Sequence, residues 1–527
     1  MRSLVSLFCT AAFLFMIASP TSGQTGPAPG VATPRTTTAF PSGLGGGGVN
    51  ADFDSLIDLI ISTIATESWA ENGGGEAEIR PYVSGVYADA AGVLRRYQVR
   101  QTGSLSSDLA AAVDLADVRR GATAASADDA ADDPRRASPL RYVSLRRLEA
   151  KLATSQAERA PIRSEVLTLA GLRRVRYVLL LPPTNDEPGD LLLAGPAGDW
   201  RAVGDGRIVS ADTGESVVRL DDLLTLLRRA ERGSKGPMGC SIDPRPEALA
   251  AAQAFLSSSK DKAVPPSRRA AWSERLREKL GLQDIRIFGI DPTSRAAGVL
   301  VEADHHMKLI GMGLEEGVPG VDGYLETLVK ERRRAPASTG VLRWWFSMHY
   351  TAINATPEGD AYELAGPGAR VMSEKELLDT QGGRAAAAQN DEVAEAFAGS
   401  FSRHFADLCR KYPIYSELRN VFDLAIACEI ARDAREKTTN AWRPDFLLNE
   451  QSLPLPTYTP ARVVETVVNH RELNRRTFVT GVSGGVWSDP RSVLASRRQI
   501  KARSAYDAFG NRPAAPSDLG RWWWDAE

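Results

Sequence analysis

Residues 477–490 read TFVTGVSGGVWSDP, a β-like run that enters the pentapeptide Gly-Val-Ser-Gly-Gly. This pentapeptide fits the G-x-S-x-G pattern of a serine-hydrolase nucleophile elbow, with Ser483 as the nucleophile. An elbow needs a helix directly after it and a histidine later in the chain. Pro490 opposes an immediate helix, and all five histidines precede Ser483. We therefore interpret the stretch as a glycine-rich turn between strands.

A triad in another chain order remains an alternative, because triads on unrelated folds occur in several orders. His470 would then be the base. Too little chain follows Ser483 for most of a hydrolase domain. We expect that Ser483 is not a nucleophile and that fluorophosphonate probes leave it unlabelled.

The amino terminus has the three parts of a secretory signal peptide, which we place at 1–23. A positive start precedes the apolar stretch Leu4–Ala18, and Thr21-Ser22-Gly23 offers small residues for cleavage. No later stretch reaches the roughly 18 uncharged apolar residues of a membrane helix. We expect a periplasmic or secreted protein with no transmembrane segment in the mature chain.

Composition and cysteine usage limit the classes of partner and of covalent crosslink. The chain has 64 Lys and Arg against 66 Asp and Glu, so its net charge of -2 argues against nucleic acid as a partner. Cys9 leaves with the signal peptide, and Cys240, Cys409 and Cys428 remain. Helical spacing places Cys409 and Cys428 too far apart for a bridge, so we expect three unpaired thiols.

The chain divides into segments of different composition, which predict an α+β (mixed α/β) fold. A small α+β unit contains a helix from Asp52 and two strands within Ile79–Arg96, around a turn at Asp89–Gly92. The main body should fold without the first 139 residues. The expected segments are a flexible linker at 24–49, the small unit at 50–100, a disordered linker at 101–139, the main body at 140–487 and a C-terminal tail at 488–527.

Within the body, β-hairpins alternate with helices, and two hairpins resemble each other. One lies within 176–196 and the other within 349–367, and both end in Ala-Gly-Pro, which is compatible with two related halves or with coincidence. A third strand pair is predicted at Ile285–Ile290 and Gly298–Ala303. Helices are predicted after Ser144 and near 221–229, 246–256 and 272–279, with a C-terminal pair whose apolar stripes lie in 393–408 and 415–426. The tryptophans at 522–524 should dock onto the protein's own surface.

The body contains, in order, the stretches LRYVSL at 140–145, LAGL at 169–172, AGP at 194–196, CSIDP at 240–244, VEAD at 301–304 with MKLIG at 307–311, and ELRNVFD at 417–423. Together these stretches resemble a secreted family of unknown function from planctomycete bacteria. The resemblance covers most of 140–487 and implies no activity. Upstream, 52–81 contains TESW at 66–69 and Gly73-Gly74. This stretch resembles a segment of planctomycete secretin-like envelope proteins, without a secretin barrel pattern beside it.

Two classes of function fit these observations. The first is a non-catalytic binding or interaction module that docks onto envelope or secretion machinery and needs no cofactor. The second is a periplasmic hydrolase or metal-dependent enzyme. Its candidate residues are Glu302, Asp304 and His306, because alternate residues of a strand point to one face. Ligands at alternate strand positions lie too far apart for most zinc sites, so we predict no metal there.

Overall fold

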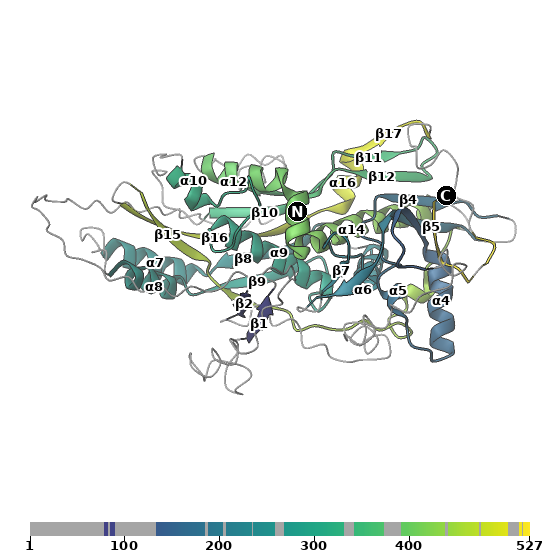
Figure 1. Cartoon of the computed structure of the whole chain (residues 1–527), viewed down its shortest axis with the longest axis horizontal. Helices are drawn as coiled ribbons and strands as arrows, with labels where there is room; N and C mark the ends of the chain where they lie inside the picture. The colour runs from purple at the N-terminus through teal and green to yellow at the C-terminus, as the bar shows by residue number, and fades with distance from the viewer. Residues whose placement is uncertain are drawn as a thin grey trace, which may run out of the picture.

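The structure is a computed structural model of the 527-residue chain. Within the described residues, its elongated body contains two seven-stranded β-sheets with helices packed around them, and two further sheets have two strands each (Figure 1). Helices and strands are both abundant, so the predicted α+β class is confirmed. The described residues are 78–82, 85–89, 133–184, 188–203, 207–233, 236–258, 268–330, 342–373, 392–437, 441–473, 476–503, 516–518 and 520–526.

The first sheet is organised around the long strand β16 (Arg476–Ser488). β16 runs parallel to β10 and antiparallel to β8, and it also pairs with β15. The order across the sheet is β13-β10-β16-β8-β9-β14. The bounds are β13 Gly368–Ser373, β10 Leu342–His349, β8 Met238–Pro244, β9 Leu282–Phe288, β14 Val463–Glu465 and β15 Val468–Leu473.

Ser483 lies inside β16, where it pairs with Arg343 of β10 and is buried. The interpretation of this stretch as a turn is therefore wrong, because the strand continues through both glycines. Gly484 and Gly485 have φ of +150° and +154°. A Cβ at Gly484 would overlap the carbonyl of Trp344, and one at Gly485 would overlap that of Cys240. The glycines thus permit close approach of the neighbouring strands rather than a nucleophile elbow.

The second sheet unites the two hairpins predicted from sequence. β4 (Tyr177–Leu181) and β5 (Asp190–Ala197) form the first hairpin, and β11 (Ala352–Ala355) and β12 (Ala361–Ala365) form the second. β12 pairs antiparallel with β4, so the hairpins are neighbours. Duplication stays a hypothesis. The order is β17-β11-β12-β4-β5-β3-β18, with β17 at Arg498–Ile500, β3 at Ser138–Ser144 and β18 at Trp523–Asp525.

The predicted C-terminal helix pair is confirmed. α12 (Glu392–Arg403) and α13 (Phe405–Lys411) carry the first aromatic stripe, which packs against α14 (Pro413–Lys437). The Phe401 ring meets the Tyr415 ring edge to face at 5.2 Å between centroids. Such contacts join helices in a way that depends on ring geometry as well as on apolar area.

The other predicted helices of the body are also present. Ser144 caps α4 (Leu145–Ala157) by accepting from the Arg147 N–H. The remaining elements are α5 Ser164–Leu167, α6 Leu220–Glu231, α7 Pro246–Ser258, α8 Arg269–Leu280, α10 Tyr324–Lys330, α15 Asp445–Leu448, α16 Pro490–Arg497, β6 Trp200–Ala202 and β7 Ile208–Ser210.

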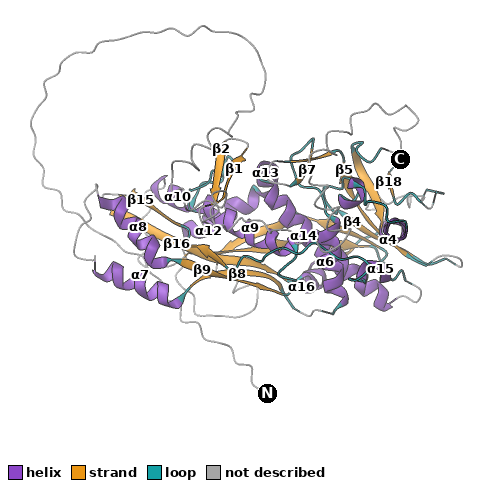
Figure 2. Ribbon diagram, turned by 90° about the horizontal axis from the view of Figure 1, so that it is seen from below, coloured by secondary structure: helices purple, strands orange, loops and turns teal. Residues whose placement is uncertain are grey.

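The strand predicted at Gly298–Ala303 is wrong, because these residues lie inside the helix α9 (Arg295–Gly311). Ser294 caps α9 by accepting from the Ala297 N–H. The first turns of α9 are buried on nearly all sides, so its apolar run lacks the 3.6-residue alternation that reveals a surface helix. In Figure 2, α9 lies over the strands β8 and β16, and α14 lies beside α9.

The thiols of Cys240, Cys409 and Cys428 are free and buried, as expected. The small unit contains an antiparallel hairpin of β1 (Glu78–Tyr82) and β2 (Gly85–Asp89), which turns earlier than the predicted 89–92. The helix predicted from Asp52, the signal peptide and both linkers, apart from the end of the second at 133–139, lie outside the described residues. None of the helices in the described ranges combines the length and apolar character needed to cross a bilayer.

The C-terminal tryptophans are buried against the body, which confirms the predicted docking. β18 pairs antiparallel with β3 at one edge of the second sheet. β17 pairs in parallel with β11 at the opposite edge. Residues beyond 487 therefore add a strand to each edge of this sheet.

Candidate functional site

The three candidate residues lie on α9, and the helix separates them. Glu302 and His306 are one turn apart and share a face, whereas Asp304 points to the opposite side. Arg295 lies two turns before Glu302 on the same face. We call the face formed by Arg295, Glu302 and His306 the polar stripe of α9.

Glu302 forms an ion pair with Arg207, which lies just before β7. Arg207 is itself buried, and its Nε donates to Glu417 of α14 at 3.0 Å. Arg207 thus joins α9 to α14 through two carboxylates. Because its guanidinium is planar and carries several donors, it can serve both acceptors at once.

Glu417 also pairs with Arg295, whose Nη2 lies 3.2 Å from Oε1. The same Nη2 lies 3.3 Å from Oδ2 of Asp222, at the start of α6. Asp221 adds a further carboxylate, paired with Arg219 at 3.3 Å. The polar stripe therefore leads into a buried ionic network shared by α6, α9 and α14.

Asp222 has the most perturbed carboxyl of this network. Burial raises its pKa from 3.8 to about 7; Arg295 opposes the rise, and the neighbouring charge of Asp221 adds to it. Asp222 thus exchanges a proton near neutral pH while held in a fixed position. A general acid or base needs this property, although structural ion networks also perturb pKa values.

His306 occupies the other end of the polar stripe. Its Nδ1 shares a hydrogen bond of 2.7 Å with the Tyr415 hydroxyl, and its Nε2 lies 3.8 Å from Glu315. Burial, followed by the charge of Arg207, lowers the His306 pKa to about 3. Burial raises the Tyr415 pKa well above 10. Both groups are therefore neutral at pH 7.

Asp304 faces the first sheet, away from the polar stripe. Its Oδ2 lies 2.6 Å from Lys308 Nζ, and neither side chain is exposed. Burial raises the Asp304 pKa, and Lys308 opposes the rise. Asp304 therefore belongs to an internal ion pair and does not join Glu302 and His306.

The same structure reveals a second buried network that sequence reasoning missed. Asp423 of α14 accepts from the Tyr350 hydroxyl at 2.7 Å and from Arg174 Nε at 2.8 Å. Glu429, two turns further along α14, pairs with Arg229 and Arg432. The available signal was the spacing of Glu417, Asp423 and Glu429 at six-residue intervals in a helix whose residues 414–431 are all buried. Acidic residues in so apolar a helix indicate internal cations.

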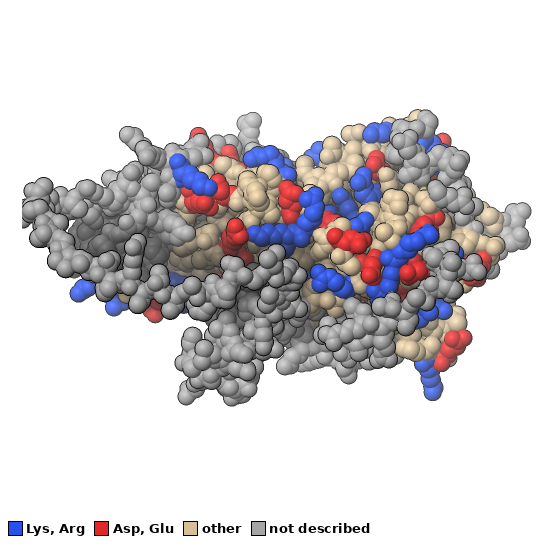
Figure 3. All heavy atoms as spheres, in the orientation of Figure 1, with Lys and Arg blue, Asp and Glu red and all other residues tan. Residues whose placement is uncertain are grey.

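Within the residues that the structure describes, no group of three His, Cys, Asp or Glu side chains is arranged to hold a metal ion. On the face shown in Figure 3, cationic and anionic side chains alternate. The geometry thus provides fixed charges and one carboxyl that titrates near neutrality.

Residues 240–324 match a family model described as a protein of unknown function, DUF1598. The match begins in β8 and ends at the start of α10, so it contains the whole of α9. It is shorter than the 140–487 region expected from the resemblance. Comparisons with curated proteins and with solved structures found no match.

Proposed function

We propose that this protein is an exported, non-catalytic module that binds another protein of the cell envelope. The observation that carries the proposal concerns the three candidate catalytic groups, each of which already has a partner inside the fold. Glu302 pairs with Arg207, Asp304 with Lys308, and His306 with Tyr415. Glu302 and His306 thereby join α9 to neighbouring parts of the chain, and Asp304 and Lys308 neutralise each other within α9.

Export rests on the amino-terminal sequence, whose charged, apolar and small-residue parts lie in that order. The resemblance to exported planctomycete proteins, and of 52–81 to a segment of secretin-like proteins, favours an envelope location. Mass spectrometry of the protein from its native cells should find cleavage near Gly23. Recovery of intact Met1 from the envelope fraction would contradict export.

A hydrolase or metal-dependent enzyme is the second candidate, and Asp222 is the observation that favours it. Its pKa of about 7 lies where general acid–base catalysis is most efficient. Glu302 and His306 would then be positioning or catalytic residues of the same network. Arg219 and Arg295, the arginines near Asp222, both form ion pairs, which favours a structural role for the Asp222 carboxyl.

The two candidates differ in what a purified sample does. For the binding module, crosslinking in native cells should identify one envelope protein, and the two purified proteins should form a complex by calorimetry. For the enzyme, the sample should hydrolyse ester, phosphoester or peptide substrates and lose that activity in Asp222→Asn. Hydrolysis with that dependence, in the absence of a reconstituted complex, would replace our proposal.

A further inference from the structure

The strand β17 forms one edge of the second sheet, and β18 forms the other. β17 pairs with β11 on one side, and all three of its residues are exposed. Ile500 is 57% exposed, more than most large apolar side chains of the described chain. Edge strands present unpaired backbone groups, which another extended chain can use.

Backbone geometry shows which groups face outward. The Lys501 N–H donates to the Ala355 carbonyl at 2.9 Å, so the backbone of Lys501 faces β11. Successive residues of a strand direct their N–H and C=O groups to opposite sides. The N–H and C=O of Ile500 therefore point away from β11, toward the open edge.

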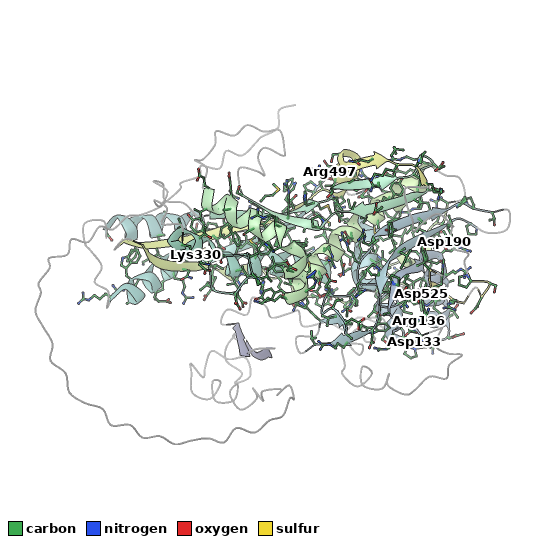
Figure 4. The ribbon with its side chains drawn as sticks, turned by 45° about the horizontal axis from the view of Figure 1, so that its top comes forward. Asp133, Arg136, Asp190, Lys330, Arg497 and Asp525 are labelled. Atoms are coloured by element: carbon green, nitrogen blue, oxygen red, sulfur yellow. The ribbon has the colours of Figure 1, made fainter. Side chains whose placement is uncertain are left out.

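Cations without carboxylate partners accompany this edge. Within the described residues, Arg497 and Lys501, which flank β17 in the chain, form no ion pair, unlike the buried Arg207 and Arg295. The nearby Arg503 is different, because Asp360 already neutralises it. Figure 4 places Arg497 on the side of the second sheet opposite Asp525.

We propose that the β17 edge binds an acidic, extended segment of a partner protein, which adds a strand beside Ile500. The proposal rests on the binding function proposed above and names its surface. From Arg497 to Lys501 the chain spans about 13 Å, which matches four or five residues of a peptide strand. Backbone hydrogen bonds would supply affinity, and carboxylates of the peptide would pair with Arg497 and Lys501.

The test uses the full mature chain and an octapeptide of alternating glutamate and valine, blocked at both ends. We expect binding by calorimetry that weakens at least about tenfold between 50 and 500 mM salt, because the paired charges are exposed. A matched peptide of alternating lysine and valine should not bind. Equal binding of both peptides, or no binding of either, would overturn the proposal.

Two variants test separately how the backbone hydrogen bonds and the charged side chains contribute to peptide binding. Ile500→Pro removes an outward N–H that β11 does not use, so it should weaken binding about tenfold without lowering the melting temperature. Arg497→Glu combined with Lys501→Glu should abolish binding. Gln499→Ala is the matched control, because its backbone faces β11, and it should bind normally.

Anionic phosphatidylglycerol vesicles distinguish a membrane from a peptide. Sedimentation of the protein with vesicles, lost in the double variant but retained in Ile500→Pro, would overturn the proposal in favour of lipid. If the native complex of the proposed function forms normally with the double variant, only this surface is wrong. If no native complex forms with the unaltered protein, the binding function itself fails.

Discussion

Oδ2 of Asp304 lies 2.6 Å from Nζ of Lys308, one helical turn away, and both side chains are wholly buried. The pair lies where α9 meets β8 and β16, within the segment that matches the DUF1598 model. Two charges removed from water lose free energy of hydration, and their mutual attraction offsets only part of that loss. Each residue therefore depends on the other to remain charged in the interior.

We predict that Lys308→Met destabilises the fold by about 3–5 kcal/mol, because it leaves Asp304 buried without its partner. The double variant Asp304→Leu, Lys308→Met should recover most of this loss. Urea unfolding followed by circular dichroism measures both. Lys330→Met, at an exposed ion pair, is the control and should leave the midpoint unchanged. A double variant no more stable than Lys308→Met would show that packing, not charge, explains the loss.

Asp222 gives the stability a characteristic dependence on pH. Its pKa is about 7 in the fold and near 3.8 when unperturbed, so the folded state binds the proton more tightly. The resulting stabilisation is complete below about pH 4 and is lost as the pH rises to about 7. Asp222→Asn resembles the protonated form and should remove this decline.

Melting temperatures of the two proteins between pH 4 and 8 provide the measurement. The difference between the two melting temperatures at each pH reports on Asp222 alone, because both proteins contain His306. The lowered pKa of His306 makes both proteins more stable as the pH rises over part of this range, which is opposite to the effect of Asp222. Glu417→Gln serves as the control, because it weakens contacts with Arg207 and Arg295 and should destabilise at every pH. Parallel pH curves for Asp222→Asn and the unaltered protein would contradict the proposed proton affinity.

The parts of the fold that the sequence predicts are those formed by residues close together in the chain. Alternating strand patterns with turn residues between them predicted β4–β5 and β11–β12, and aromatic spacing predicted the packing of α12 and α13 on α14. α9 was mistaken for a strand because Val299, Leu300 and Val301 are buried on several sides, where periodicity carries no signal. The sequence offers Glu302 and His306 as candidates but not Arg207, because Arg207 lies 95 residues from Glu302 and only the fold brings them together.

A substitution at Gly484 tests whether the GVSGG stretch forms a continuous strand. Gly484→Ala places a methyl group on the Trp344 carbonyl, and φ is already +150°, so we expect a loss above about 4 kcal/mol or no soluble protein. Gly236→Ala is a matched control, since Gly236 has φ of +118° but no atom near its Cβ position. It should cost about 1 kcal/mol. Similar unfolding midpoints for the two variants would show that β10 and β16 lie further apart than described.

The C-terminal strand provides the last prediction. Asp525 pairs with the wholly buried Arg141 through both oxygens, at 2.7 and 3.0 Å, and lies beside Arg136 in Figure 4. Burial alone would raise the Asp525 pKa, but hydrogen bonds and charge from Arg141 lower it. The contact should therefore weaken as the pH falls through that lowered pKa.

Asp525→Ala leaves Arg141 without its carboxylate partner, so β18 should detach from β3 and expose Trp523 and Trp524 to water. A red shift in tryptophan emission, with a melting temperature lowered by several degrees, is the expected result. Asp518→Ala, at an exposed position, should change neither. An unshifted emission spectrum in Asp525→Ala would mean that the buried tryptophans hold β18 in place without the ion pair.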